Sequence, residues 1–160
     1  MKGADPGRSY RVFFIAPEKR LGTVVELKFD TARKGPLEVR LEPTATIRGK
    51  LANPDGSVPM AGQAGLKICF SAEPRELTGQ ERFDLELTDF YSNIVGQRNA
   101  FMHDWNTGKQ GEFEYQAIVP GAWYELSCND GALSATVSTP ILKPGEVLDL
   151  GTVTLKERNR

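Results

Sequence analysis

The sequence predicts an all-β fold, and more specifically an antiparallel β-sandwich, from three observations. Many short segments alternate apolar and polar residues with a period of two, which is typical of strands with one buried face. Pro, Gly, Asn and Asp separate these segments at short intervals, as tight turns require. No convincing helix longer than two turns is found, and many short strands with frequent turns are the pattern of a sandwich.

Composition and charge exclude several classes of protein. The chain has 160 residues, of which 39% are hydrophobic and 26% charged, enough for one substantial core. Its apolar runs are all well short of the roughly 18 residues of a membrane span. Residues 1–50 carry 11 Lys and Arg against 6 Asp and Glu, but these are interspersed with apolar residues. We therefore expect no membrane span and no nucleic-acid partner, which would need a concentrated basic stripe.

The first part of the chain predicts three strands, at residues 9–15, 23–28 and 37–42. In the third, Leu37, Val39 and Leu41 alternate with charged residues, and Pro43 closes the block.

The next part predicts strands at residues 45–52 and 66–70, separated by the turn signal Asn53-Pro54-Asp55-Gly56. Residues 73–101 stay open between two interpretations. Phe83, Leu85 and Leu87 alternate as in a strand, which we favour, but Phe83, Leu87, Phe90 and Ile94 also have helical spacing.

Residues 108–126 predict a β-hairpin whose turn is Pro120-Gly121, since proline fixes φ and glycine accepts a positive φ. Short strands follow at residues 134–138 and 151–156, with a Pro/Gly-rich loop between them at residues 139–145. The apolar phases of all these strands predict one core: Ile47, Leu51, Leu66, Ile68, Phe70, Phe113, Tyr115, Tyr124, Leu126, Val153 and Leu155.

The chain also contains an internal repeat. Residues 6–12, PGRSYRV, correspond to residues 120–126, PGAWYEL, at an offset of 120 − 6 = 114 positions. Residues 22–25 have a similar echo at residues 135–137, and residues 34–41 have one at residues 143–146 and 153–155. We expect residues 1–43 to be the closing strands of a preceding repeat, residues 44–157 to be one whole unit, and residues 158–160 to be a tail. The alternative is that the Pro-Gly-x-x-Tyr turn arose twice independently.

The whole unit resembles the carboxypeptidase regulatory-like domains. The matching segments, in order, are residues 47–51 (IRGKL), 53–57 (NPDGS) with 60–62 (MAG), 107–113 (TGKQGEF) and 119–126 (VPGAWYEL). This resemblance implies a transthyretin/prealbumin-like (Ig-like) sandwich topology, and an extracellular or cell-envelope location within a larger multidomain protein. It does not imply the zinc peptidase, because His103 is the only histidine in the chain.

Catalytic and metal sites are not predicted, and no cofactor is expected. Asp104, Asn106, Gly108, Gln110 and Glu112 alternate like oxygen ligands, but the glycine and glutamate of a calcium loop are missing at the required positions. His103 could serve as the base for a nucleophile at Ser92 or Cys128, but no catalytic motif surrounds any of these residues. Cys69 and Cys128 have opposite strand phases, so we do not expect a disulfide between them.

Three aromatic residues are the candidate ligand contacts: Trp105, Trp123 and Tyr91. Aromatic faces at the loop ends of a sandwich can stack on sugars or dock a partner chain. The sequence therefore predicts a non-catalytic sandwich module, acting as a structural spacer or protein-interaction domain beside neighbouring domains. The alternative is a carbohydrate- or peptide-binding accessory domain that uses these aromatics. Unpaired strand edges left by a partial repeat also predict dimerisation or strand exchange.

Overall fold

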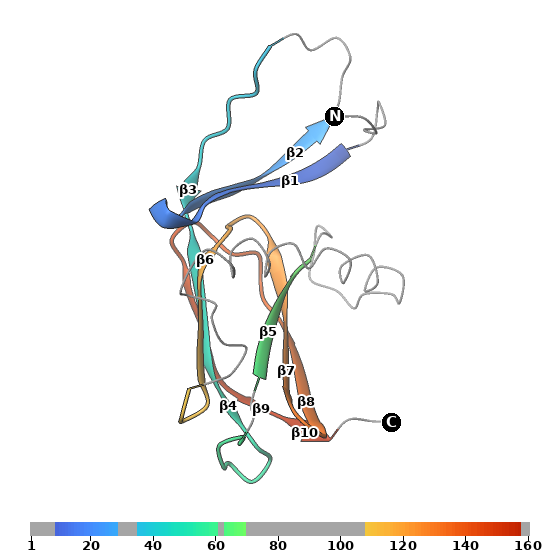
Figure 1. The fold of residues 1–160 in the computed structure, drawn as a ribbon. Helices are drawn as coiled ribbons and strands as arrows, with labels where there is room; N and C mark the ends of the chain where they lie inside the picture. Colours follow the sequence, from blue (N-terminus) through green and yellow to red (C-terminus); the bar gives the residue numbers. More distant parts are fainter. Residues whose placement is uncertain (1–8, 29–34, 61–62, 70–107, 158–160) are drawn as a thin grey trace.

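The computed structural model describes residues 9–28, 35–60, 63–69 and 108–157 (Figure 1). These residues form ten β-strands and one 3-10 turn, η1 (Pro17–Lys19), so the all-β prediction is confirmed. The strands are β1 (Ser9–Ala16), β2 (Leu21–Lys28), β3 (Glu42–Pro43), β4 (Ala45–Ala52), β5 (Gln63–Cys69), β6 (Glu112–Ile118), β7 (Trp123–Asp130), β8 (Leu133–Ser138), β9 (Val147–Thr154) and β10 (Lys156–Glu157). The ambiguous segment 73–101 lies outside the described residues.

The strands form three small sheets. Their strand orders are β1-β2-β3, β6-β4-β9 and β10-β8-β7-β5. Every pairing is antiparallel except that of β4 with β9, which is parallel. The second sheet thus places β4, the first described strand after residue 43, directly beside β9, near residue 157.

One hydrophobic core joins the second and third sheets. Its residues come from alternate positions of the strands and from the loops that connect them: Ala45, Ile47, Leu51, Phe113, Tyr115, Ile118, Val119, Ala122, Tyr124, Leu126, Cys128, Leu142, Val153 and Leu155. All eight predicted core residues whose side chains are described are buried, so this part of the prediction is confirmed. The side chains of Leu66, Ile68 and Phe70 lie outside the described set.

The predicted hairpin at residues 108–126 is wrong. β6 pairs with β4 and β7 pairs with β5 and β8, so the Pro120-Gly121 turn carries the chain from one sheet to another. The turn glycine has a φ of 81°, as expected, but its N–H donates to the carbonyl of Leu142 at 2.8 Å. Val119 and Pro120 are fully buried in the crossover. The turn chemistry was predicted correctly, but alternation along two strands does not say which strand each will pair with.

Tyr124 fixes this crossover in place. Its hydroxyl donates to the carbonyl of Val119 at 2.7 Å, across the turn, and its ring is fully buried. Its backbone N–H donates to the Oγ1 of buried Thr139 at 2.9 Å, and the N–H of Thr139 donates back to the carbonyl of Tyr124. The crossover is thus tied both to its own start and to the loop that follows β8, as the tyrosine corner of immunoglobulin domains ties a strand to the chain before it.

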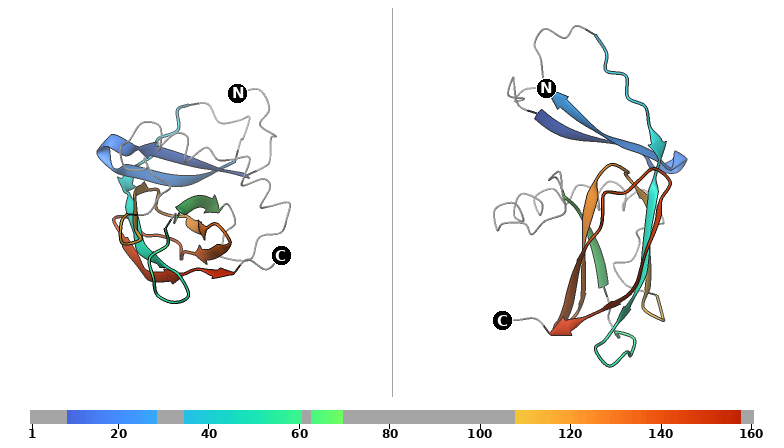
Figure 2. Two further views of the ribbon diagram at one scale, coloured as in Figure 1. Left: turned by 60° about the horizontal axis from the view of Figure 1, so that its bottom comes forward. Right: turned by 180° about the vertical axis from the view of Figure 1, so that it is seen from behind.

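β1 and β2 form a hairpin that lies across one end of the core (Figures 1 and 2). Phe13, Ile15 and Val24 pack against the core from one face of this hairpin. A side chain at Gly22 would approach Val119 within 3.1 Å, so the hairpin backbone lies close to the β6–β7 crossover. The hairpin therefore depends on the main unit for one of its faces.

The N-terminal sheet repeats the pairing of β7, β8 and β10. β1 and β7 have the same length and lie 123 − 9 = 114 positions apart. Val12 pairs with Val25 as Leu126 pairs with Val137. β3 pairs Glu42 with Gly22 as β10 pairs Lys156 with Ser134. The internal repeat seen in the sequence is thus also a repeat of strand register.

The strand predicted at residues 37–42 is mostly absent. Only Glu42–Pro43 pairs, as β3, and residues 36–41 have no strand structure. Their counterparts 114 positions later belong to β9 and Leu155, which pair with β4 and Ala52. Residues 36–41 have the right alternation, but among the described residues no strand lies beside them in the place of β4, and a strand needs a partner for its backbone groups.

The turn before β6 gives a test of this packing. Gly111 has a φ of 84°, and a Cβ there would lie 2.5 Å from the carbonyl oxygen of Leu51 in β4. Gly56 has a nearly identical φ of 82° with nothing within 4 Å. We predict that Gly56→Ala costs about 1 kcal/mol, the usual left-handed penalty, and that Gly111→Ala costs a further ~1–3 kcal/mol from the clash. Urea unfolding of both variants measures the difference in their free energies of unfolding. Equal losses of free energy in the two variants would contradict the predicted clash at Gly111.

Candidate functional site

The sequence-predicted ligand contacts do not come together in the described residues. Trp123 has 0% of its side chain exposed, so its indole is not presented at the surface. Glu125, two residues along β7, is also buried at 4% exposure. Trp105 and Tyr91, together with His103 and the alternating oxygen ligands before Gly108, lie outside the described residues.

One candidate site among the described residues is a shallow, open depression of about 600 Å³ on the β6-β4-β9 sheet. It is lined by Arg48, Gly49, Lys50, Glu112, Phe113, Glu114, Asp149, Gly151 and Thr152. Sequence reasoning missed this cluster as a site, because its members come from three strands far apart in the chain. The signal that could have found it is the set of charged residues at alternate positions of each strand, because these side chains point to the face opposite the core.

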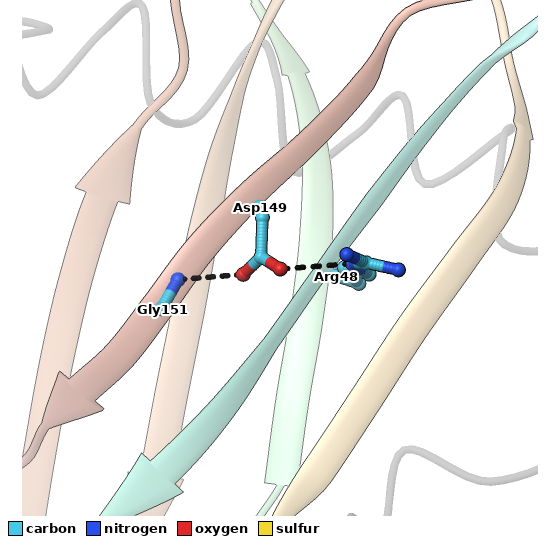
Figure 3. A network of polar contacts seen from close by, with 3 residues as sticks. All are labelled: Arg48, Asp149 and Gly151. Atoms are coloured by element: carbon cyan, nitrogen blue, oxygen red, sulfur yellow. Dashed lines mark hydrogen bonds and ion pairs between the residues drawn. The ribbon is translucent and has the colours of Figure 1, made fainter.

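Arg48 and Asp149 form the central contact of this face (Figure 3). The Nε of Arg48 donates to Oδ2 of Asp149 at 2.9 Å, and the N–H of Gly151 donates to Oδ1 at 2.9 Å. The Gly151 N–H and the Arg48 guanidinium together hold the pKa of Asp149 below its ordinary value. Both side chains are 52% exposed, so this pair contributes little to stability.

A β-bulge in β9 creates that geometry. Arg48 pairs with Asp149 and Lys50 with Thr152, so two residues of β9, Leu150 and Gly151, stand opposite one residue of β4. Gly151 has a φ of 62°, a conformation that glycine adopts without strain. The bulge turns the Gly151 N–H toward the carboxylate. Asp149 is therefore held by a local turn as much as by its cationic partner.

Charges alternate across the three strands of the depression. Arg48 on the central strand stands in register with Glu114 on β6 and Asp149 on β9, and Lys50 stands in register with Glu112. The Glu112 carboxylate also accepts the backbone N–H of Gln110 in the preceding turn at 3.1 Å. Opposite charges directly across neighbouring strands stabilise a sheet. The charged groups of this face thus have structural partners within the sheet.

Gly49 and Phe113 are explained by packing. A Cβ on Gly49 would lie 2.6 Å from Cζ of Phe113 and 3.1 Å from the carbonyl of Gly151. The Phe113 ring therefore occupies the space a side chain at position 49 would fill. This glycine serves the contact between β4 and β6, where an aromatic ring covers it.

The predicted Asp-Gly turn is present and is held by its own side chains. Asp55 Oδ1 accepts both the Oγ–H of Ser57 at 2.7 Å and the backbone N–H of Ser57 at 2.9 Å. These bonds lower the pKa of Asp55, the side-chain bond most. Gly56 supplies the positive φ that closes the turn.

Cys128 has none of the properties of a nucleophile. It is buried in the core with 1% exposure, it is a free thiol, and burial raises its pKa to about 12. Burial likewise raises the pKa of the neighbouring Tyr115 hydroxyl. In the pairing of β5 with β7, Cys69 stands opposite Trp123, and Cys128 stands opposite Ala64. Ala64 and Cys69 are five residues apart along β5, so the two cysteines are separated by roughly 17 Å at the rise of a strand. The expectation of no disulfide between the two cysteines is confirmed.

Metal and membrane sites were also sought in the part of the chain that the structure describes. No group of three or more His, Cys, Asp or Glu residues there is placed to hold a metal ion. No helix among the same residues is long and apolar enough to cross a membrane.

The comparisons with known proteins give no family for this chain. No protein-family model matches it, and no curated protein matches it.

The buried thiol gives a prediction that can be checked by chemical labelling. In a Cys69→Ser background, Cys128 of the folded protein should react with a disulfide reagent at pH 8 roughly 1,000-fold more slowly than in urea. The reason is that raising the pKa from 9.0 to about 12 lowers the thiolate fraction by that factor.

The same shift predicts the sign of a pH dependence. Because the folded thiol keeps its proton above pH 9.0, where the unfolded thiol loses it, its contribution to stability is complete below pH 9.0 and falls as the pH rises toward about 12. Equal labelling rates in the folded and unfolded protein would show that Cys128 is accessible, contrary to this account.

Proposed function

We propose that residues 44–157 form a non-catalytic β-sandwich domain, which acts as a structural spacer or protein-interaction module of a larger multidomain protein. Two sheets that contribute to one core support the sandwich architecture. A transthyretin/prealbumin-like topology of the carboxypeptidase regulatory-like kind is part of this proposal. So are residues 1–43 as the closing strands of a preceding unit, and an extracellular or cell-envelope location.

The motifs that carry the resemblance lie at positions with structural roles. Residues 47–51 lie in β4, residues 53–57 make the Asp-Gly turn, and residues 108–111 make the turn before β6. Residues 119–126 make the crossover that Tyr124 fixes. The described residues of these motifs are thereby explained by turn and packing chemistry, which supports a shared fold.

The parallel pairing of β4 with β9 is the observation that carries the spacer function. The two strands run in the same direction as neighbours, and they are the first strand and the last long strand of the unit. A force that pulls residue 44 away from residue 157 is therefore directed along the strands. All the evenly spaced hydrogen bonds of a parallel ladder then bear the load together. Such a unit resists extension along the chain, as a domain in a tandem array needs to do.

The charged groups described above support a non-catalytic role. Asp149, Asp55 and Glu112 each accept a hydrogen bond from a nearby backbone N–H. Cys128 is a protonated, buried thiol. These groups stabilise turns, a bulge and the core of the unit itself, which is what a structural module requires of its polar residues.

Force spectroscopy on the full chain tests the spacer function. With handles attached at residues 44 and 157, we expect one cooperative rupture with a gain in contour length of roughly 350–400 Å, since each residue spans at most about 3.6 Å.

The matched control moves one handle from residue 44 to Asp55, which lies in the turn after the other end of β4. The force then separates β4 and β9 at one end and breaks their bonds one at a time, so the rupture force should fall about twofold or more. Equal forces in the two geometries, or gradual extension without a rupture, would contradict a load-bearing role.

A further inference from the structure

β9 is an edge strand. In the sheet order β6-β4-β9 it stands last, and among the described residues it pairs with β4 alone. An edge strand presents unpaired N–H and C=O groups, which are a template for a strand of another chain. The residues of β9, VLDLGTVT, include no proline or lysine, and Asp149 is the only charged one. Val147, at the start of the strand, is 57% exposed. The composition of β9 therefore protects this edge poorly.

Gly151 is an extra residue in this strand. The side chains of β9 and of the position after it that pack on or in the core are those of Leu148, Leu150, Val153 and Leu155. Their spacing is two, three and two positions, and it would be two throughout if Gly151 were absent. A strand that keeps one face toward a core needs a period of two. Gly151 therefore adds one position to a segment that would otherwise alternate regularly.

Packing does not explain this glycine. A Cβ at Gly151 would have nothing within 4 Å. This differs from Gly49, where the ring of Phe113 takes the space that a side chain would fill. The feature of Gly151 that calls for glycine is its φ of 62°, which glycine adopts without strain. Gly151 thus serves the shape of the β9 backbone at the bulge.

Asp149 holds the bulge in this shape (Figure 3). Its Oδ1 accepts the N–H of Gly151 at 2.9 Å, and its Oδ2 accepts the Nε–H of Arg48 at 2.9 Å. One backbone donor of β9 is therefore bonded within the strand itself and is not available to a strand that arrives from outside. The Asp149 side chain is also 52% exposed, so an incoming strand would approach a negative charge.

We propose that the Gly151 bulge, held by Asp149, is a guard that prevents β9 from pairing with β9 of a second copy of this chain. The bulge leaves four residues of the edge before it, 147–150, and three after it, 152–154. Each stretch is shorter than the usual strand of about five or six residues. Bulges protect sheet edges in this way, because they interrupt the ladder and twist the edge away.

The interaction that the guard opposes is an antiparallel pairing of two β9 strands about a two-fold axis, the commonest symmetry of protein dimers. Without Gly151, residues 147–155 would read VLDLTVTL, which alternates regularly, contains a single charge and lacks proline. Segments of this composition pair readily with copies of themselves. The inference goes beyond the proposed function and does not depend on it, since it concerns the edge of one sheet.

Deletion of Gly151 tests the guard. In sedimentation equilibrium at about 100 µM protein, we expect the native chain to be a monomer and the deletion variant to be a dimer. In that dimer, amide exchange at residues 147–154 should slow by about 10-fold or more relative to the native chain, because the outer backbone groups of β9 gain partners.

Val147→Lys is the matched control, because a lysine at an exposed edge position opposes strand pairing. In the deletion variant it should restore the monomer. In the native chain it should change neither the mass nor the exchange rates of residues 153–155. A dimer of the deletion variant that persists with Val147→Lys would locate the association elsewhere and would overturn the proposal.

Asp149→Thr tests the guard without shortening the strand. It leaves the Gly151 N–H without its acceptor and removes the negative charge, so we expect a weaker dimer, seen at higher protein concentration. A strict monomer of this variant, or a folded deletion variant that stays monomeric, would contradict the proposal. Loss of amide protection at residues 153–155 in the deletion variant would also contradict it, because the glycine would then be required by the fold itself.

Discussion

β4 is the strand on which the rest of the structure depends. It pairs with β6 on one side and with β9 on the other, and it contributes fully buried Ile47 and Leu51 to the core. The contrast with the N-terminal part of the chain shows how strong this constraint is. Val153 and Leu155 are buried next to β4, while residues 37–41 form no strand and have no such neighbour in the part of the chain that the structure describes. Alternation of apolar and polar residues makes a segment compatible with a strand, but the segment forms one only where a neighbouring strand pairs with its backbone.

This distinction explains what could be predicted from the sequence. Period-two alternation identified the fold class and the buried residues, because the phase of a strand depends only on its own residues. The partner of each strand depends on residues far away, so β6 and β7 were predicted as a hairpin although they lie in different sheets. The Pro120-Gly121 turn is common to both arrangements. The crossover has an additional bond, because the hydroxyl of Tyr124 donates to the carbonyl of Val119 across the turn.

The candidate site was harder to predict for the same reason. Arg48 and Asp149 lie 101 residues apart and meet only because β4 and β9 are parallel neighbours. Trp123 and Tyr124 are neighbours in β7, yet both residues are fully buried, so Trp123 is not available as the ligand contact that the sequence suggested. A strand covered on both faces does not show simple alternation of exposure. The described polar groups bond to the backbone and to one another within the sheets, which agrees with the structural role proposed above.

The most direct test of this account is amide hydrogen exchange on the native chain, comparing residues 36–41 with residues 150–155. Val39 and Leu41 correspond to Val153 and Leu155, and the two segments have the same register relative to the strand pairs that accompany them. If a β4-like partner decides which segment becomes a strand, residues 150–155 will be strongly protected and residues 36–41 will exchange at rates close to those of an unstructured peptide. Comparable protection of both segments in the monomeric protein would contradict the account.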